Sequence, residues 1–239
     1  MKYGIFLFAI LLFSCEKNST DERNNTRLQF IKAEGKIHQS FEYNDDNLLV
    51  KENWFSSCES NPSDEYMYTY IGTKPHTIKS VIRSLYSSTS AICDPASGIH
   101  SYVVIYYDNA GRISKIIREN GTYTTFYYNA NGFIEKQVVN DGATNNYIYT
   151  YRRDAAGNMI EQTDAQGNKT QYEFDNKTNP YYRMNVHPNV ITAFYNSPNN
   201  VVKIRSGNSS TAIIYEYNSS GLPVKMLEAN GAVYEFVYR

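Results

Sequence analysis

Residues able to do acid–base or metal chemistry are few in this sequence and lie far apart. The histidines are His38, His76, His100 and His187, and no two have the short spacing of a metal-binding pair. Each is expected at the surface or in a turn. No Gly-x-Ser-x-Gly elbow is present, and the glycines do not form a phosphate-binding loop. The sequence therefore predicts no catalytic residue, no metal site and no cofactor.

The acidic residues that stand out are at turns, namely Asp108, Asp141, Asp154 and Asp175. There a carboxylate can accept hydrogen bonds from nearby backbone N–H groups. No run has the pattern of a calcium-binding loop. A carboxylate pair for glycoside hydrolysis stays open, because its members need not be close in sequence.

Aromatic residues are the more prominent chemical feature, since 23 of the 239 residues are tyrosine. Trp54 and Phe55 lie side by side in a region of low regularity and form a candidate ligand platform. Sugar rings stack on exposed aromatic rings, so this pair supports glycan binding. The other interpretation is structural, because tyrosine packs its ring while its hydroxyl reaches water.

The first residues have the features of a targeting segment. Lys2 precedes an apolar run, residues 4–13, that is too short to span a bilayer. Leu12-Phe13-Ser14-Cys15 then resembles the lipobox of bacterial lipoproteins. The resemblance implies that residues 1–14 are a signal peptide and that Cys15 carries the lipid that anchors the chain. A plain signal peptide with an incidental cysteine, or an uncleaved anchor, is the alternative.

Residues 15–27 are polar, lack apolar periodicity and are expected to form a flexible tether. Lys17, Asp21 and Glu22 resemble the surface-export signal of Bacteroidetes-type lipoproteins, although an ordinary solvated linker has the same composition. The chain is expected in the bacterial cell envelope as an outer-membrane lipoprotein, facing the periplasm or the surface.

Cys58 and Cys93 are the only cysteines after Cys15. In an exported chain this even number favours a disulfide, which would stabilise the fold by about 3–4 kcal/mol through loop closure. A reactive or metal-binding pair is the alternative, and no histidine motif supports it.

These residues must be positioned by a repeated element, which is clearest from residue 105 to residue 142. Tyr107 and its turn recur at Tyr128, 21 residues later. A ten-residue offset between glycines occurs four times, in Gly111 and Gly121, Gly132 and Gly142, Gly157 and Gly167, and Gly221 and Gly231. The segments between them are rich in Ile, Thr, Tyr and Phe, which favour strands. Asn-Gly and Asp-Gly favour type I′ turns, so we predict β-hairpins with positive φ at Gly121 and Gly142.

The motif Tyr-Asp-x-x-Gly-Arg at residues 107–112, followed by an apolar strand and a second glycine turn, resembles the YD repeat of the RHS family. A further copy at residues 153–158 has Arg153 where the tyrosine belongs. The resemblance covers about residues 100–239, with fainter copies from residue 41 onward, and implies strips of β-hairpins. In the large toxins of the family these strips spiral into a closed cocoon. That size, the toxin-type C-terminal domain and the self-cleavage motif are absent, so the cargo-encasing role is not implied.

The chain is therefore expected to be all-β, an antiparallel β-hairpin meander of YD-like repeats of about 22 residues. The meander would form an extended twisted sheet or, alternatively, curl into an open or closed barrel. Residues 28–239 are expected to form a single domain with an irregular region at about 54–98. The repeat weakens after Phe174, where Asn179-Pro180 and His187-Pro188 disturb strand pairing.

Three functions follow from these features. The first is a lipid-anchored envelope protein that binds or scaffolds without catalysis, and the second is a surface glycan-binding lipoprotein. The third is an enzyme of unknown type. The expected partners are the membrane, through the N-terminal lipid, and a glycan or another envelope protein. A net charge of −1 with no basic run predicts no nucleic-acid partner.

Overall fold

Strands alternate with glycine turns along the described part of the chain, which comprises residues 26–56, 61–84, 94, 96–184 and 191–239 of a computed structural model. The strands are β1 (Leu28–Ala33), β2 (Lys36–Tyr43), β3 (Leu49–Trp54), β4 (Asp64–Ile71), β5 (Lys74–Ile82), β6 (Ile99–Tyr107), β7 (Ile113–Arg118), β8 (Tyr123–Tyr128), β9 (Ile134–Asn140), β10 (Asn146–Arg153), β11 (Met159–Thr163), β12 (Lys169–Thr178), β13 (Asn199–Ser206), β14 (Ser209–Tyr217), β15 (Pro223–Glu228) and β16 (Val233–Tyr238). Two short helices, η2 (Tyr182–Met184) and α2 (Ala193–Asn196), lie between β12 and β13. The all-β prediction is confirmed.

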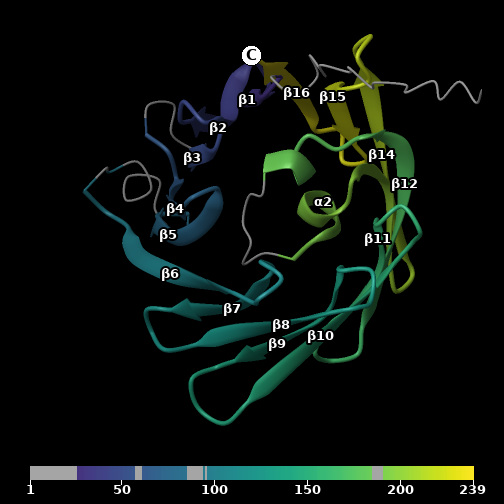
Figure 1. Cartoon of the computed structure of the whole chain (residues 1–239). Helices are drawn as coiled ribbons and strands as arrows, with labels where there is room; N and C mark the ends of the chain where they lie inside the picture. Colours follow the sequence, from purple (N-terminus) through teal and green to yellow (C-terminus); the bar gives the residue numbers. More distant parts are fainter. Residues whose placement is uncertain (1–25, 57–60, 85–93, 95, 185–190) are drawn as a thin grey trace, which may run out of the picture.

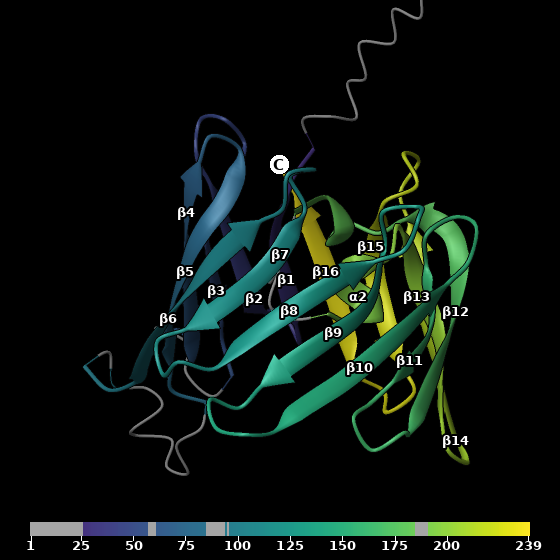
Figure 2. The same ribbon diagram turned by 60° about the horizontal axis from the view of Figure 1, so that its bottom comes forward.

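Each strand pairs antiparallel with its neighbours in sequence, and β1 also pairs with β16, so the sheet closes into a barrel (Figures 1 and 2). Ile31 lies opposite Phe236 across this seam. Beyond it the backbones of Arg27 and Arg239 exchange hydrogen bonds of 3.2 and 2.9 Å. The meander is confirmed, and its form is the closed barrel rather than the extended sheet. Closure pairs the backbone groups that an extended sheet would leave open at its two edges.

The two faces of the barrel wall differ in chemistry. Inward-facing side chains form one apolar core, whose fully buried members include Ile105, Ile116 and Met159. The outward face carries ion pairs between neighbouring strands, namely Lys51–Glu65, Arg205–Glu173 and Lys225–Glu216. The same face also exposes large apolar side chains, among them Ile148 and Ile214.

The described residues between β12 and β13, 179–184 and 191–198, lie inside the barrel and are called the interior segment below (Figure 1). Of its described residues, Met184, Ile191 and Ala193 are buried in the core. A barrel of sixteen strands encloses more space than wall side chains alone can fill. The interior segment supplies this missing core, and it begins at the Asn179-Pro180 step where the repeat weakens.

The glycine turns confirm the predicted backbone, although not the predicted turn type. Gly121 and Gly142 have φ of +82° and +81°. Asn120 has no positive φ, so the expected type I′ turn, which needs two such residues, is wrong there. The Arg118 amide donates to the Thr122 carbonyl at 2.8 Å, which leaves three residues in the loop. A loop of this length combines a type I turn with one left-handed glycine.

The two turns of each repeat lie at opposite ends of the barrel, because successive strands run in opposite directions. The turns that follow Tyr43, Tyr107 and Tyr128 share one end, called the tyrosine end. The turns at Gly121 and Gly231 share the other, called the far end.

The motif tyrosine makes the same hydrogen bond in five places at the tyrosine end. Its hydroxyl donates to a backbone carbonyl near the start of the preceding strand, in the pairs Tyr43–Leu28, Tyr70–Leu49, Tyr107–Pro75, Tyr128–Ile113 and Tyr238–Pro223, at 2.5–2.8 Å. Burial is the main cause that raises the pKa of Tyr70, Tyr107 and Tyr128 to about 12. The hydroxyl therefore stays protonated and remains a donor at neutral pH. These tyrosine–carbonyl bonds account for the recurring tyrosine.

The region 54–98, expected to be irregular, contains the β4–β5 hairpin, and this corrects the expectation. Tyr66, Tyr68 and Tyr70 alternate along β4 and pack with the core. Residues two apart share one face of a strand, so this alternation is itself a strand signal. It was outweighed by the Ser-rich composition of the connections on either side.

Candidate functional site

A cavity of about 310 Å³ lies between the interior segment and the wall, toward the far end. Aromatic side chains dominate its lining: Trp54, Tyr215, Tyr234 and Phe236 come from the wall, and Phe194 and Tyr195 come from the interior segment. We call it the aromatic cavity. Its volume is at the lower end of the range for small-molecule pockets.

The indole of Trp54 is oriented by a buried carboxylate. Trp54 Nε1 donates to Glu52 Oε1 at 2.6 Å, and the Tyr68 hydroxyl donates to Glu52 Oε2 at 3.2 Å. Glu52 is fully buried, and it lies two residues before Trp54 on the same face of β3. Because the indole N–H is used in this bond, Trp54 presents its ring to the cavity.

His38 packs beside Trp54 on the neighbouring strand β2. Its ring centroid lies 6.1 Å from that of Trp54 and 5.5 Å from that of Tyr234. Burial lowers the pKa of His38, so the imidazole is neutral at pH 7. The expectation that His38 lies at the surface or in a turn is wrong, since it is a strand residue that lines the cavity.

Among the described residues that line the cavity, Glu228 is the one carboxylate. It is the last residue of β15. Burial raises the pKa of Tyr234, and the negative charge of Glu228 raises it further. Within the described ranges of the chain, no Lys and no Arg line the cavity. The cavity therefore combines aromatic rings with a negative charge.

Side-chain hydrogen bonds hold the interior segment in shape against the cavity. Asn179 Nδ2 donates to the carbonyls of Phe194 and Ser197 at 2.6 and 2.8 Å. The Tyr181 hydroxyl donates to Gln39 Oε1 on β2 at 3.1 Å. The polar side chains Asn179 and Gln39, both part of the lining, are thus already engaged in structural bonds.

Arg153 attaches the interior segment to the wall. Its Nη1 donates to the carbonyl of Gly157 at 2.7 Å and to the carbonyl of Asn196, the last residue of α2, at 2.6 Å. Arg153 occupies the motif position where other repeats have tyrosine. A guanidinium reaches further and donates more bonds than a phenol, which explains the substitution at the repeat that must hold the segment.

A second cavity of about 400 Å³ lies toward the tyrosine end. Lys74 and Arg112 contribute to its lining, and Tyr195 lines both cavities. Lys74 Nζ is 5.2 Å from the centre of the Tyr107 ring, and Arg112 pairs with Asp108 at 2.8 Å. The interior segment therefore lies between two cavities that differ in the sign of their charged residues.

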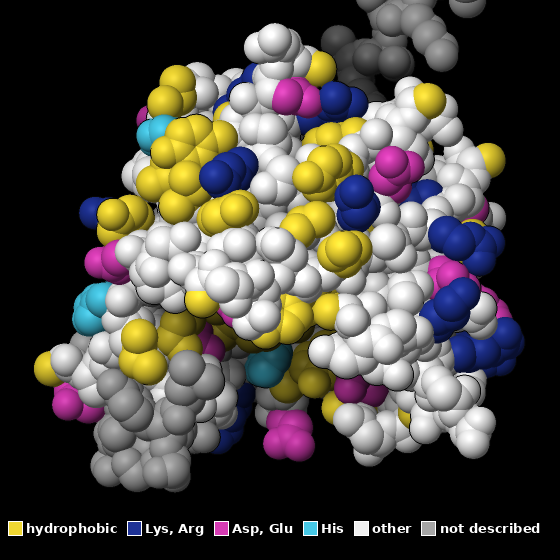
Figure 3. Space-filling model, turned by 90° about the horizontal axis from the view of Figure 1, so that it is seen from below, with side chains coloured by type: hydrophobic (Ala, Val, Ile, Leu, Met, Phe, Trp, Pro, Cys, Tyr) yellow, Lys and Arg dark blue, Asp and Glu magenta, His cyan; other side chains and the backbone are white. Residues whose placement is uncertain are grey.

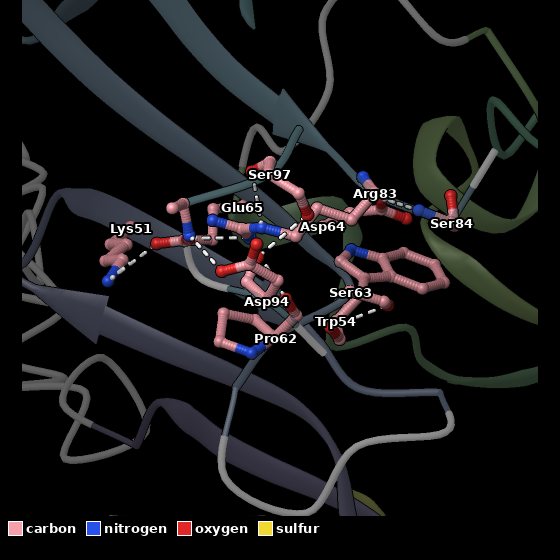
Figure 4. Close-up of polar contacts among 11 residues, drawn as sticks. Lys51, Trp54, Pro62, Ser63, Asp64, Glu65, Arg83, Ser84, Asp94 and Ser97 are labelled. Atoms are coloured by element: carbon pink, nitrogen blue, oxygen red, sulfur yellow. Dashed lines mark hydrogen bonds and ion pairs between the residues drawn. The ribbon is translucent and has the colours of Figure 1, made fainter. Parts of the chain in front are cut away.

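A polar cluster fixes the backbone beside Trp54 (Figure 4). The buried Arg83 side chain pairs with Glu65 at 2.9 Å, and it donates to the carbonyls of Pro62 and Ser97 at 3.1 and 3.0 Å. These contacts bind the connections on both sides of the β4–β5 hairpin to the wall. The end of β3 that carries Trp54 is thereby held in place.

Of the sequence-predicted site residues, Trp54 lines the aromatic cavity, whereas Phe55 is not part of the lining. The Phe55 amide donates to the His38 carbonyl at 2.8 Å. Cys15, Cys58 and Cys93 lie outside the described residues, so lipidation and the disulfide stay predictions.

Glu52, Glu228 and Tyr195 belong to the site or its support, and the sequence did not predict them. Glu52 alternates with Trp54 along one strand face, and an acidic residue at an inward position was the signal that could have identified it. Glu228 and Tyr195 are brought there only by barrel closure and by the interior segment. Among the described residues no three His, Cys, Asp or Glu side chains gather as metal ligands. None of the helices described is long and apolar enough to cross a membrane.

Fold and site together define a class: an antiparallel β-barrel with an aromatic cavity beside an interior segment. A solved porin-like protein from Bacteroides vulgatus is similar over 89% of this chain and 99% of its own, with 13% identity and a TM-score of 0.40. One from Bacteroides uniformis is similar over 87% and 91%, with 11% identity and a TM-score of 0.38. A Photorhabdus luminescens Tc holotoxin pore matches 81% of this chain but only 9% of its own, with 8% identity and a TM-score of 0.37.

At this level the likeness concerns the β-rich fold. No protein-family model matches the sequence, and no curated protein matches it either. Function must therefore be argued from the site of this chain.

Proposed function

We propose that this protein is a lipid-anchored component of the bacterial envelope, built of YD-like repeats, that binds a small ligand in the aromatic cavity without transforming it. The observation that carries the proposal is the cavity itself, a space of about 310 Å³ lined by aromatic rings from the wall and the interior segment. Apolar pockets with few polar groups are the usual form of a small-molecule site.

The contacts around the cavity support binding, because they hold its walls before a ligand arrives. Glu52 orients Trp54, Asn179 fixes the fold of the interior segment, and Arg153 attaches that segment to the wall. A site whose side chains are already ordered loses less entropy on binding.

Dye uptake tests this proposal. The neutral solvatochromic dye prodan should bind the full-length protein with one site and a blue-shifted emission. Trp54 is the single tryptophan of the chain, so energy transfer from Trp54 reports that the dye is bound to the protein, and the variants below locate it. Failure of the wild-type protein to take up the dye would overturn the proposal.

Two matched variants locate the uptake. Met226→Trp enlarges a lining side chain and should lower dye affinity at least tenfold, as read from dye emission on direct excitation. Met67→Trp makes the same change on the exposed outer face of β4, and its affinity should equal that of the wild type. Equal loss in both variants would contradict a site inside the barrel.

The anchor is supported by Leu12-Phe13-Ser14-Cys15 and by an outer barrel face that carries ion pairs. Labelled fatty acid should be incorporated into the wild-type chain and lost in Cys15→Ser. Equal labelling of both chains would remove the anchor from the proposal without affecting the cavity.

A second candidate function, glycan binding, is favoured by exposed tyrosines on the outer wall. Tyr102, Tyr106 and Tyr127 are exposed and lie on β6 and β8. Figure 3 shows hydrophobic side chains interspersed with lysine and arginine on one face of the molecule. A glycan array probed with the wild type and with Tyr106→Ala tests it. Signals that Tyr106→Ala leaves unchanged would count against this surface.

A further inference from the structure

The chemistry of the aromatic cavity specifies the class of ligand, provided that the cavity binds one as proposed above. Its lining side chains supply three things: aromatic ring faces, one carboxylate, and three amides that already make hydrogen bonds within the protein. Each of these narrows the choice among anions, neutral polar molecules and cations.

An anionic ligand does not fit, because the lining offers no positive group to balance its charge. In the part of the chain that the structure describes, no Lys or Arg lines the cavity. His38 is neutral at pH 7, since burial lowers its pKa. The Glu228 carboxylate would repel an anion directly.

A neutral polar ligand such as a sugar needs several convergent hydrogen-bonding groups. The amides of the lining are already used: Asn179 Nδ2 donates to two carbonyls, and Gln39 Oε1 accepts from Tyr181. Asn200 Nδ2 lies within 3.3 Å of Asp175 Oδ2. A sugar that used these amide atoms would have to break the bonds that they already make, and a buried group left without its partner is costly.

An organic cation fits the two remaining features of the lining, which are the aromatic ring faces and the carboxylate. The faces of Trp54 and tyrosine attract a cation through the ring quadrupole, and the attraction is strongest for Trp and in desolvated sites. Tyr234 lies next to His38 and Tyr181 next to Tyr195, with ring centroids 5.5 and 5.2 Å apart, so several rings converge on the same space.

Two carboxylates add a negative potential around these rings. Glu228 lines the cavity, and its Oε2 also accepts a hydrogen bond from Asn230 Nδ2 at 3.3 Å. Glu52 is fully buried behind Trp54, and its Oε1 accepts a hydrogen bond from Trp54 Nε1 at 2.6 Å. The Glu52 carboxylate therefore lies on the far side of the indole from the cavity.

We propose that the aromatic cavity binds a compact organic cation, an alkylated ammonium group held against the faces of Trp54 and the cavity tyrosines, with Glu228 as its counter-charge. Alkyl groups on the nitrogen bring apolar surface that the rings cover, and a quaternary nitrogen needs no hydrogen bond. The cavity volume of about 310 Å³ suits such a group.

Choline and its uncharged isostere, in which carbon replaces the quaternary nitrogen, form a matched pair of probes. Both have the same shape, so only the charge differs. Titration of the full-length protein by calorimetry and by Trp54 fluorescence should show choline binding at least tenfold tighter than the isostere. Choline should also displace prodan from the cavity.

Substitution of the counter-charge gives the second readout. Glu228→Gln keeps the size of the side chain and should weaken choline about fivefold or more while leaving the isostere unchanged. The control is Glu216→Gln on the outer face of β14, where Glu216 pairs with Lys225 at 3.4 Å. This control should bind choline as the wild type does.

The possible outcomes separate this inference from the proposed function. If prodan binds but choline binds no tighter than its isostere, the proposal of a cationic ligand is refuted and the cavity remains a ligand site. Displacement of prodan by neutral monosaccharides and not by choline would also overturn the proposal of a cationic ligand. If neither prodan nor choline binds, the proposed function fails and this inference fails with it.

Discussion

At the scale of single residues, the tyrosine–carbonyl bond gives the repeat its most testable property. The Tyr128 hydroxyl donates to the Ile113 carbonyl at 2.7 Å in a partly buried site. Tyr128→Phe removes this donor and leaves the carbonyl without it, so we expect a loss of about 0.5–1.5 kcal/mol in the free energy of unfolding. Urea denaturation measures it. Tyr127→Phe on the exposed outer face is the control, and equal losses in both variants would remove the hydrogen bond as the cause.

Gly121 tests the turn at the same scale. Its φ is +82°, and a Cβ built there meets nothing within 4 Å, so substitution strains the backbone without a steric clash. Gly121→Val should therefore cost about 1–3 kcal/mol. Thermal melts followed by circular dichroism measure the change. A variant that melts with the wild type would show that the turn tolerates another backbone.

The control for Gly121→Val must be chosen on the outer face of the neighbouring strand. Thr124 is unsuitable, because it is buried and its hydroxyl accepts from Arg118 Nη1 at 3.2 Å. Thr125 is only partly buried, so Thr125→Val exchanges one β-branched residue for another at little cost.

At the scale of elements, Arg153 determines whether the interior segment stays attached. Arg153→Leu removes charge-assisted hydrogen bonds to the carbonyls of Gly157 and Asn196, each worth about 1.5–3 kcal/mol. Hydrogen exchange should accelerate at residues 191–198. Arg152→Leu is the control, since the Arg152 side chain is exposed and does not contact the interior segment. Its partner Glu161 keeps its bonds to Lys169 and Gln171 in this variant. Unchanged exchange in Arg153→Leu would mean that the segment is held by packing alone.

The strands, the turns and the interior segment differ in how far the sequence alone could predict them. Strands and glycine turns follow from local rules, so the repeat around Tyr107 and Gly121 predicted them. The interior segment follows no local rule: Asn179-Pro180 indicated an interruption, but only the size of the closed barrel requires that the interruption lie inside. The aromatic cavity depends on that segment, so Trp54 was identified by residue type, whereas its neighbours Glu228 and Tyr195 were not.

At the scale of the whole molecule, closure makes β1 and β16 neighbours although they are furthest apart in sequence. Ile31 and Phe236 face each other across the seam and are both buried. In an open sheet these strands would be edges, and an edge strand can be lost with limited damage. In a closed barrel the loss of one strand exposes two new edges and the core behind them.

Circular permutation distinguishes a closed barrel from an open sheet. In a chain of residues 26–239, a short Gly-Ser linker would join Arg239 to the first residue, and new termini would open between Asn120 and Gly121. The backbones of Arg27 and Arg239 already exchange hydrogen bonds, so the linker spans a short distance and strains nothing. We expect a melting temperature within about 3 °C of the unpermuted chain, which for a domain of this size corresponds to about 1 kcal/mol.

The matched variant deletes residues 233–239, which removes β16 and the buried Phe236 from the seam. We expect it to lose its cooperative melt, because β1 and β15 become unpaired edges and the apolar core opens to water. The same deletion in an open sheet would remove one edge strand and keep the transition. A deletion variant that melts like the full chain, or a permuted chain that fails to fold, would contradict the closed barrel as the unit of stability.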